Sequence, residues 1–130
     1  ARGAYVMGIG HRKYSLYKRD PRVDFLTTEA RKILTTSKHL DYAEAVMART
    51  VQKKANLILN VDGVLAATLL DIFIEFENFS DAQIKELLNI EFFNSYFLIP
   101  RTVGFIGNYL SQKRRDEGLF RLPEDQIYYE

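Results

Sequence analysis

The sequence has no cysteine, no tryptophan and only three prolines among its 130 residues. Without cysteine the chain cannot form a disulfide or a thiolate metal site, and this composition suits a reducing, cytoplasmic location. A long hydrophobic run is also lacking. The most apolar stretch, residues 63–70, lies between Asp62 and Asp71 and falls far short of the ~20 residues that a membrane-spanning helix needs. We therefore expect a cytoplasmic protein with no metal site and no membrane contact.

Neither sign of charge predominates, since 18 basic and 17 acidic residues give a formal net charge of +1. A protein that binds polyanions over its whole surface usually carries a larger positive excess, so any anion site should be local. The most basic stretch, residues 11–22, includes Asp20, which argues against nucleic-acid binding there. With 47% hydrophobic residues, the chain can form one compact domain of ordinary size.

Apolar spacing predicts an all-α protein. Asp20 and Pro21 form a typical helix start, and apolar residues then recur at helical spacing up to Leu34. Residues 35–39 break this pattern, and we expect a second helix over residues 40–53.

Residues 53–60 fit a strand or a buried connector equally well. Three more helices are expected, over residues 61–76, 80–96 and 101–115. Ser80 and Gln83 form a capping box that opens the second of these helices. Pro100 is expected to interrupt the helical pattern, and Gly118 to end the last helix.

Two short motifs, "GIGH" and "NVDG", suggest a site. Gly8 and Gly10 let backbone N–H groups approach a ligand, although such a glycine pair alone more often marks a turn. His11 taken alone is more often a structural histidine, and His39 is expected to be structural. Asp62 lies between apolar residues and is either a helix cap or a carboxyl group whose pKa is raised by desolvation, suited to moving protons.

Several cations have two interpretations. Arg101 follows Pro100 in an apolar stretch, where an unpaired guanidinium is costly. Such an arginine needs a carboxylate or phosphate, which it can hold by two parallel hydrogen bonds. Lys53, Lys54 and residues 112–115 are either solvated surface charges or contacts for the phosphates of an extended cofactor.

Taken jointly, three stretches resemble the citrate synthase superfamily. They are "GIGHR…DPRV", "KKANLILNVDG" and "RTVGFIGNYLSQKRRDEGLFR", and together they span nearly the whole chain. Gly63 after Asp62 is typical of the citrate-cleaving branch, which comprises ATP-citrate lyases and citryl-CoA lyases, whereas citrate synthases usually carry an aromatic residue there. The resemblance implies a citrate-synthase-like all-α fold and a part in cleaving citryl-CoA to acetyl-CoA and oxaloacetate.

The resemblance also implies roles for individual residues. His11 matches the histidine that hydrogen-bonds the hydroxyl or carbonyl of the four-carbon portion, and Asp62 matches the aspartate that exchanges a proton with the methyl carbon of acetyl-CoA. Citrate or oxaloacetate would be bound by His11 and four arginines: Arg12, Arg22, Arg101 and Arg121. Arg121 would reach into the site of a neighbouring subunit. Coenzyme A would meet Gly8, Ile9, Gly10, Lys53 and Lys54.

Two structural parts and several partners follow from the same resemblance. Residues 1–100 would form the small-domain helices with the CoA-binding segment, and residues 101–130 a return segment to the large domain and the interface of a homodimer or tetramer. The chain does not begin with Met, and we expect a preceding part that carries a second catalytic histidine. ATP and Mg would act only in a separate ligase region. Asn108 stands where the citrate-cleaving branch has a histidine.

Two other functions stay open. One is a citrate synthase that works in the condensing direction, which Gly63 makes the weaker enzymatic alternative. The other is a non-catalytic helical assembly module, suggested by the 8 tyrosines and 9 phenylalanines. Such a module would bind neither citrate nor coenzyme A.

Overall fold

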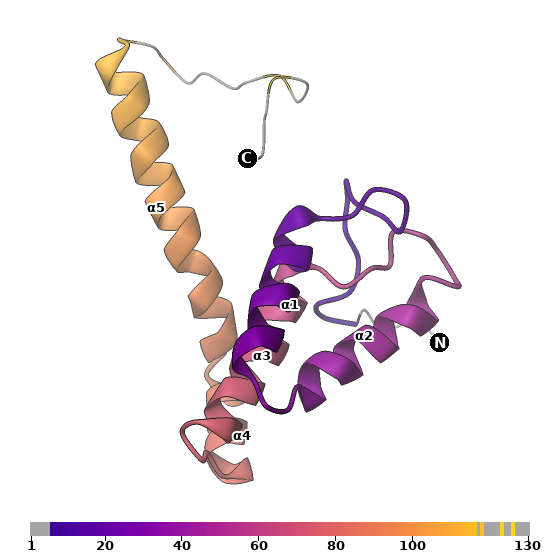
Figure 1. Ribbon diagram of the computed structural model, residues 1–130. Helices are drawn as coiled ribbons and strands as arrows, with labels where there is room; N and C mark the ends of the chain where they lie inside the picture. Colours follow the sequence, from indigo (N-terminus) through magenta and orange to yellow (C-terminus); the bar gives the residue numbers. More distant parts are fainter. Residues whose placement is uncertain (1–5, 117, 119–122, 124–125, 127–130) are drawn as a thin grey trace. The chain divides into compact units, whose positions relative to one another are not determined.

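The computed structural model of the chain describes residues 6–116, 118, 123 and 126, and over these residues the fold is all-α, as the sequence predicts. The extended pairing in this part of the chain is limited to two isolated antiparallel bridges, Ile9–Leu59 and Ser15–Lys18. The helices are α1 (Pro21–Ile33), α2 (Lys38–Thr50), α3 (Val61–Glu75), α4 (Asp81–Asn89) and α5 (Phe92–Arg114) (Figure 1).

The chain divides into two compact units, Ala1–Phe97 and Leu98–Glu130. The division falls inside α5 and close to residue 100, where the family resemblance placed a boundary. The assignment of the first unit to a small domain and of the second to a large domain and a subunit interface stays a prediction.

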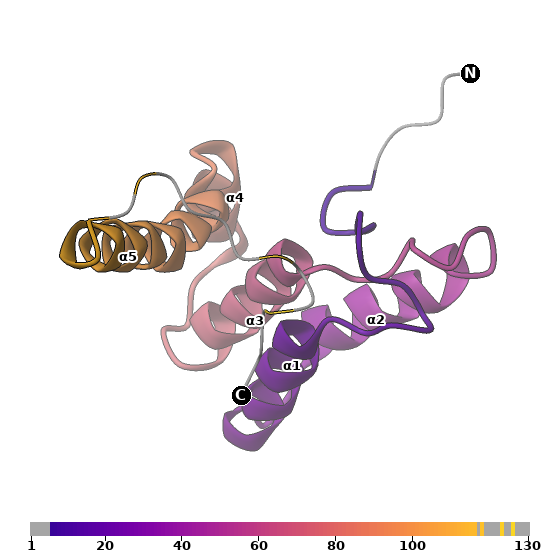
Figure 2. The ribbon, with the colours of Figure 1, turned by 90° about the horizontal axis from the view of Figure 1, so that it is seen from above.

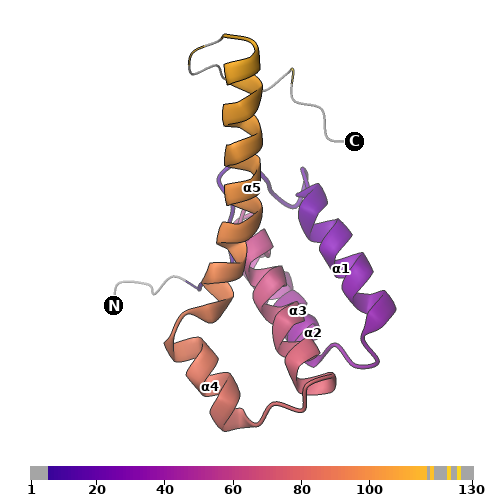
Figure 3. The ribbon, with the colours of Figure 1, turned by 90° about the vertical axis from the view of Figure 1, so that its left-hand side faces the viewer.

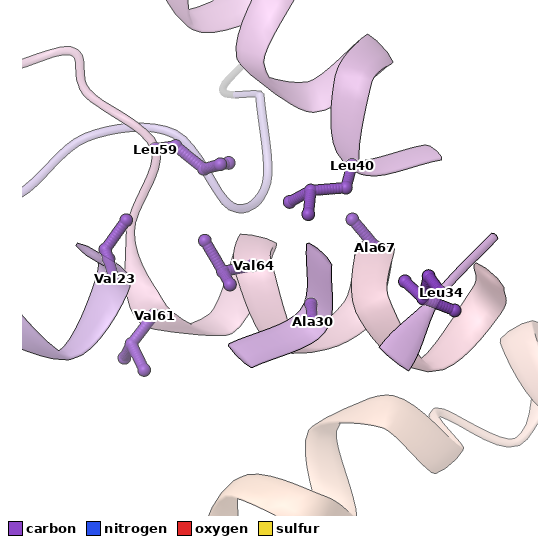
Figure 4. Close-up of a cluster of buried hydrophobic side chains, with 8 residues drawn as sticks. All are labelled: Val23, Ala30, Leu34, Leu40, Leu59, Val61, Val64 and Ala67. Carbon is purple, nitrogen blue, oxygen red and sulfur yellow. The ribbon is translucent and has the colours of Figure 1, made fainter. Parts of the chain in front are cut away.

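α3 is the central helix of the first unit, and both α1 and α2 pack against it (Figures 1 and 3). Aliphatic side chains fill the space between these helices (Figure 4): Val23, Ala30, Leu34, Leu40, Leu59, Val61, Val64 and Ala67. Leu40 and Val64 are completely buried. Because burying a side chain of this size contributes roughly 1.5–3 kcal/mol, the cluster holds α3 firmly and thereby fixes the start of that helix, where Asp62 lies.

α1 begins as the sequence predicts. Asp20 is its N-cap and accepts a hydrogen bond from the backbone N–H of Arg22, while Pro21 occupies the first turn. Val23 and Ala30 are buried on the face toward α3, but Ile33, which the apolar spacing also placed on that face, is 58% exposed.

α2 begins at Lys38 rather than at residue 40, because a carboxylate from another helix caps it. The buried Asp71 of α3 accepts the backbone N–H groups of His39 and Leu40 at 3.0 and 3.1 Å. Its Oδ1 also lies 2.8 Å from Nδ1 of His39. His39 therefore belongs to a helix rather than to a polar break, and it has a partner that the sequence pattern did not show.

Glu75, one helical turn beyond Asp71, holds the turn between α1 and α2. Its carboxylate accepts the backbone N–H groups of Thr35 and Thr36 at 2.8 and 3.0 Å. These two hydrogen bonds keep the pKa of Glu75 below its ordinary value. One face of α3 thus supplies both the apolar contacts and the anionic caps that position its neighbours.

The helix boundaries after residue 80 differ from the prediction. The Ser80–Gln83 capping box forms as expected, but α4 ends at Asn89, and the left-handed backbone of Glu91 (φ 55°) separates it from α5. α5 then runs through Pro100, so the predicted interruption is wrong. A proline removes one backbone donor, and here the helix continues on both sides of that loss.

The last helix ends at Arg114, and Asp116 rather than Gly118 takes the positive φ (51°) that follows it. Among the described residues, no helix has the length and apolar character that crossing a bilayer would require. Arg121 lies outside the described residues.

Candidate active site

The glycine-rich segment, residues 8–11, is hydrogen-bonded to the connector of residues 53–60 that leads into α3 (Figure 2). Ile9 and Leu59 form an antiparallel bridge. Asn60 donates its backbone N–H to the carbonyl oxygen of Gly8 at 2.9 Å and its side-chain Nδ2 to that of Gly10 at 3.1 Å. The stretch that sequence alone left as strand or connector is therefore a connector that holds the glycine-rich segment.

The two motifs touch through their glycines. A Cβ atom added to Gly63 would lie 2.6 Å from the carbonyl oxygen of Gly8 and 2.7 Å from Cδ1 of Leu59. A Cβ atom on Gly8 would lie 2.8 Å from Cα of Gly63, and the φ of Gly8 is +80°. No side chain fits at either position without a shift of the backbone. Gly63 thus lets the segment carrying His11 lie directly against the first turn of α3, next to Asp62.

His11 is held in one tautomer by the backbone that follows it. Its Nδ1 accepts hydrogen bonds from the backbone N–H groups of Lys13 and Tyr14, both at 3.0 Å. An imidazole whose Nδ1 accepts carries its proton on Nε2 when neutral. The half-buried ring therefore presents an N–H donor at Nε2, and this atom lies 4.0 Å from Oδ2 of Asp20.

Asp20 does more than cap α1. Its side chain is completely buried, and it accepts hydrogen bonds from Nε and Nη2 of Arg22 at 3.0 and 2.7 Å. Burial alone would raise the pKa of Asp20, but the hydrogen bonds and charge of Arg22, with a smaller contribution from His11, hold the pKa below its ordinary value. Two residues that the resemblance assigns to the citrate site, His11 and Arg22, thus face one carboxylate.

Asp62 lies in the first turn of α3 but does not cap it. The N-cap is Asn60, whose side chain accepts the backbone N–H of Gly63 at 3.0 Å. A carboxylate in the first turn is favoured by the helix dipole. The side chain of Asp62 is exposed, so the burial suggested by its apolar neighbours is not provided by the described part of the chain.

Two loops place several cations along one edge of the unit. Backbone hydrogen bonds from His11 to Asn56 (3.0 Å) and from Leu16 to Ala55 (2.8 Å) join the loop after the glycines to the loop after α2. The cations carried by these loops are exposed: Arg12, Lys13, Lys18, Lys53 and Lys54. Such an edge can bind phosphate groups beside the glycine-rich segment.

The arginines of the C-terminal stretch belong to the second unit or to residues outside the described part. Arg101 lies on α5 within the second unit and is exposed, so the buried surroundings expected from its apolar neighbours are absent from the described residues. Arg121 is outside those residues.

Sequence reasoning missed two contributors to the site. Asp20 was identified only as a cap, although an arginine two residues later is the signal for a second role. Asn56 was not identified at all, and its Nδ2 donates to the carbonyl oxygen of His11 at 3.2 Å. Over residues 6–116 and the three later described positions, no group of three or more histidine, aspartate or glutamate side chains could hold a metal ion.

Residues 1–122 match the family described as citrate synthase, C-terminal domain, and the chain belongs to this family. The resemblance drawn from the three motifs is thereby confirmed.

Within that family, the chain is homologous to ATP-citrate synthases. It is 41% identical over 127 residues to the ATP-citrate synthase of Homo sapiens, and the matched region covers 98% of this chain and 12% of the relative. It is 37% identical over 129 residues to a probable ATP-citrate synthase of Dictyostelium discoideum, where the matched region covers 99% of this chain and 21% of the relative. The chain therefore spans between about an eighth and a fifth of these relatives.

Solved structures agree with the sequence relatives. ATP citrate lyase from Methanothrix soehngenii, in complex with citrate and coenzyme A, is 37% identical with a TM-score of 0.77, over 95% of this chain and 20% of that one. A variant ATP citrate lyase from Methanosaeta concilii, in complex with (3S)-citryl-CoA, is 36% identical with a TM-score of 0.79 over the same shares. The citrate-synthase-like all-α fold predicted from the sequence is confirmed.

Proposed function

We propose that this chain supplies part of the site at which an ATP-citrate lyase cleaves citryl-CoA to acetyl-CoA and oxaloacetate. The observation that carries the proposal is the contact between Gly8 and Gly63, which places the His11 segment against the helix turn of Asp62. The homology supports it, because the similar ATP citrate lyases of Methanothrix soehngenii and Methanosaeta concilii are solved in complex with citrate and coenzyme A and with (3S)-citryl-CoA.

His11 and Arg22 would bind the four-carbon portion of the substrate. Arg22 offers a fixed guanidinium to a carboxylate, and charge-assisted hydrogen bonds of this kind contribute about 1.5–3 kcal/mol each. Cleavage turns the tertiary hydroxyl of the citryl group into a carbonyl. Since Nε2 of His11 already carries a proton in the neutral tautomer, it would donate a hydrogen bond to that oxygen rather than take its proton. The hydroxyl proton would pass to solvent water, and protonated Asp62 would return one proton at the methyl carbon.

Asp62 would supply the proton that the methyl carbon of acetyl-CoA gains when the carbon–carbon bond breaks. An exposed carboxyl group in this chain can become desolvated only when substrate or another part of the enzyme covers it. Such cover would raise the pKa of a carboxyl group and keep the protonated form accessible.

Coenzyme A would lie along the glycine-rich segment and the cationic edge. Gly8, with φ +80°, and Gly10, with φ +104°, carry no side chain beside Ile9. The N–H groups of Ile9 and Gly10 already donate to the carbonyl oxygens of Val6 and Ile58, so the expected approach of backbone N–H groups to a ligand does not apply to these two. Lys53 and Lys54 would contact phosphate groups of the cofactor, and Arg12 would assist at the citrate side. These residues fit an extended, phosphate-bearing thioester better than a compact anion.

The remaining expectations belong to the whole enzyme. Arg101 and Arg121 would bind substrate carboxylates, with Arg121 acting in a neighbouring subunit of a homodimer or tetramer. The second histidine would come from a preceding part of the enzyme, and ATP and Mg from a ligase region. A cytoplasmic location remains a prediction from composition.

The test uses the assembled enzyme with Asp62→Asn. General acid catalysis contributes about 10²–10⁴-fold, so citryl-CoA cleavage should fall at least about 100-fold while calorimetry shows unchanged citrate affinity. The matched control is Asp81→Asn, which alters another exposed first-turn carboxylate, on α4. Full turnover by Asp62→Asn would refute the mechanism.

A non-catalytic assembly module is the second candidate function, favoured by the exposed apolar side chains of α5. It predicts that the assembled protein binds neither citrate nor coenzyme A in calorimetry, whereas the lyase proposal requires both to bind. A citrate synthase is disfavoured by the Gly8–Gly63 contact, because an aromatic side chain at position 63 would collide with the glycine-rich segment.

A further inference from the structure

One buried carboxylate faces both side chains that we assign to the four-carbon portion of the substrate. Asp20 is completely buried on its side chain, whereas the side chain of Arg22 is 48% exposed and that of His11 is 21% exposed. Both residues therefore reach solvent with one part and rest on Asp20 with the other. Each would present its outer part to a ligand.

Helix capping alone does not explain an aspartate at this position. A cap needs one oxygen acceptor, which serine, threonine or asparagine also provides. Here Oδ1 accepts both the backbone N–H and Nε of Arg22, while Oδ2 accepts Nη2 at 2.7 Å. The fork engages two of the five N–H donors of a guanidinium and fixes the plane of the group. Only a carboxylate gives two acceptor oxygens at this spot.

Oδ2 of Asp20 also lies near Nε2 of His11. Oδ2 lies 4.0 Å from Nε2, which is too long for a hydrogen bond. With Nδ1 held by the backbone N–H groups of Lys13 and Tyr14, the ring cannot turn away. The backbone thus orients Nε2 of His11 beside the carboxylate that holds Arg22.

We propose that Asp20 is a positioning residue of the lyase site, which holds the guanidinium of Arg22 in one orientation beside the backbone-held Nε2–H donor of His11. The inference rests on the proposed function. It assigns Asp20 no contact with substrate, so its effect should pass through Arg22. Loss of the carboxylate would remove the fork that fixes the plane of the Arg22 guanidinium.

The experiment is Asp20→Asn in the assembled enzyme, with kcat and KM for citryl-CoA measured separately. Asparagine keeps the cap but turns one oxygen of the fork into an N–H donor, so kcat/KM should fall on the order of 10- to 100-fold, the equivalent of one charge-assisted hydrogen bond. The fall should appear mainly as a rise in KM, because Arg22 would bind a substrate carboxylate that is present before as well as during cleavage.

The matched control is Ser80→Ala, which removes a helix cap on α4 and should leave kcat and KM unchanged. An Asp20→Asn enzyme that loses thermal stability but keeps the parent kcat and KM would show that Asp20 is only a cap, and would overturn the inference. If Asp20→Asn does not fold, Asp20→Glu takes its place. It keeps the negative charge but displaces the fork, so KM should rise, and parent-like kinetics would overturn the inference.

The outcome is separable from that of the proposed function. If the unmodified assembled enzyme fails to cleave citryl-CoA, the proposed function fails. If it cleaves citryl-CoA and the Asp20 variants behave as the parent does, the positioning role alone fails.

Discussion

The three-helix cluster around α3 and residues 98–110 of α5 are both rich in apolar side chains, but only the cluster buries them. In the cluster, eight aliphatic side chains are buried against one another. Between residues 98 and 110 of α5, seven large apolar side chains are each 51–75% exposed: Leu98, Ile99, Val103, Phe105, Ile106, Tyr109 and Leu110. Within the described residues, the apolar side chains of the first region are covered by other side chains, whereas those of the second region are exposed to solvent.

The formation of a helix and the stability of a packed unit therefore have different requirements. α5 is a continuous helix although these side chains are exposed, but apolar residues contribute stability only when something covers them. Around α3 the covering elements lie within the same hundred residues, and the candidate site is built on them. Substitutions should therefore change the free energy of unfolding strongly near α3 and weakly along residues 98–110 of α5.

The largest expected contrast is between two leucines. Leu40 is completely buried and Leu110 is 52% exposed. Leu40→Ala should lower the free energy of unfolding of the chain by about 2–5 kcal/mol, because it leaves a cavity among α1, α2 and α3. Leu110→Ala should change it by less than about 1 kcal/mol. Urea denaturation followed by circular dichroism measures both, and equal losses would show that burial does not distinguish the two leucines.

Two glycines, Gly63 and Gly104, differ in their surroundings in the same way. A Cβ atom at Gly63 would meet the carbonyl oxygen of Gly8 at 2.6 Å, whereas nothing lies within 4 Å of one at Gly104 on α5. Gly63→Ala should therefore destabilise the chain by about 1–3 kcal/mol through overpacking. Gly104→Ala should stabilise its helix by about 0.5–1 kcal/mol, because alanine is the better helix former.

The glycine pair also links stability to function. If Gly63→Ala pushes the glycine-rich segment away from α3, the assembled enzyme should lose citryl-CoA cleavage together with stability. Thermal melts and turnover assays on the same samples test this, with Gly104→Ala as the control. A Gly63→Ala enzyme with the parent melting temperature would show that the close contact does not fix the segment.

The same contrast explains how much the sequence could predict. α1 and α3 start where they were expected because their caps, Asp20 and Asn60, are local in sequence, although Asp62 rather than Asn60 had been considered for the second cap. The start of α2 was missed because its cap, Asp71, lies about thirty residues further along the chain. Local signals fix helices, whereas long-range hydrogen bonds adjust where they begin.

The candidate site follows the same rule. His11, Arg22 and Asp62 were identified through motif resemblance, and the structure brings their segments together by bonds such as that from Asn56 to the carbonyl of His11, 45 residues apart. No periodicity in the sequence encodes that pairing. The burial expected for Arg101 was inferred from apolar neighbours on a helix whose covering is not among the described residues, so the inference about its surroundings failed.

The smallest expected effect concerns a carboxylate that ties α3 to the turn before α2. Backbone hydrogen bonds from Thr35 and Thr36 keep the pKa of Glu75 below its ordinary value. A group with a lowered pKa stabilises the fold above its unfolded-state pKa of about 4.3 and loses that contribution as the pH falls through the lowered value. The melting temperature of the chain should therefore decrease as the pH is lowered through this range.

Glu75→Gln should remove part of that pH dependence, because an amide does not titrate, while Glu77→Gln, at an exposed position just beyond α3, should leave it intact. Asp20 and Asp41 also have lowered pKa values, so the decrease in melting temperature should shrink rather than vanish. The measurement is a series of thermal melts at matched ionic strength. Identical curves for Glu75→Gln and the parent would show that the turn between α1 and α2 is held by the apolar cluster and Asp71 alone, and that the anionic face of α3 adds nothing at its C-terminal end.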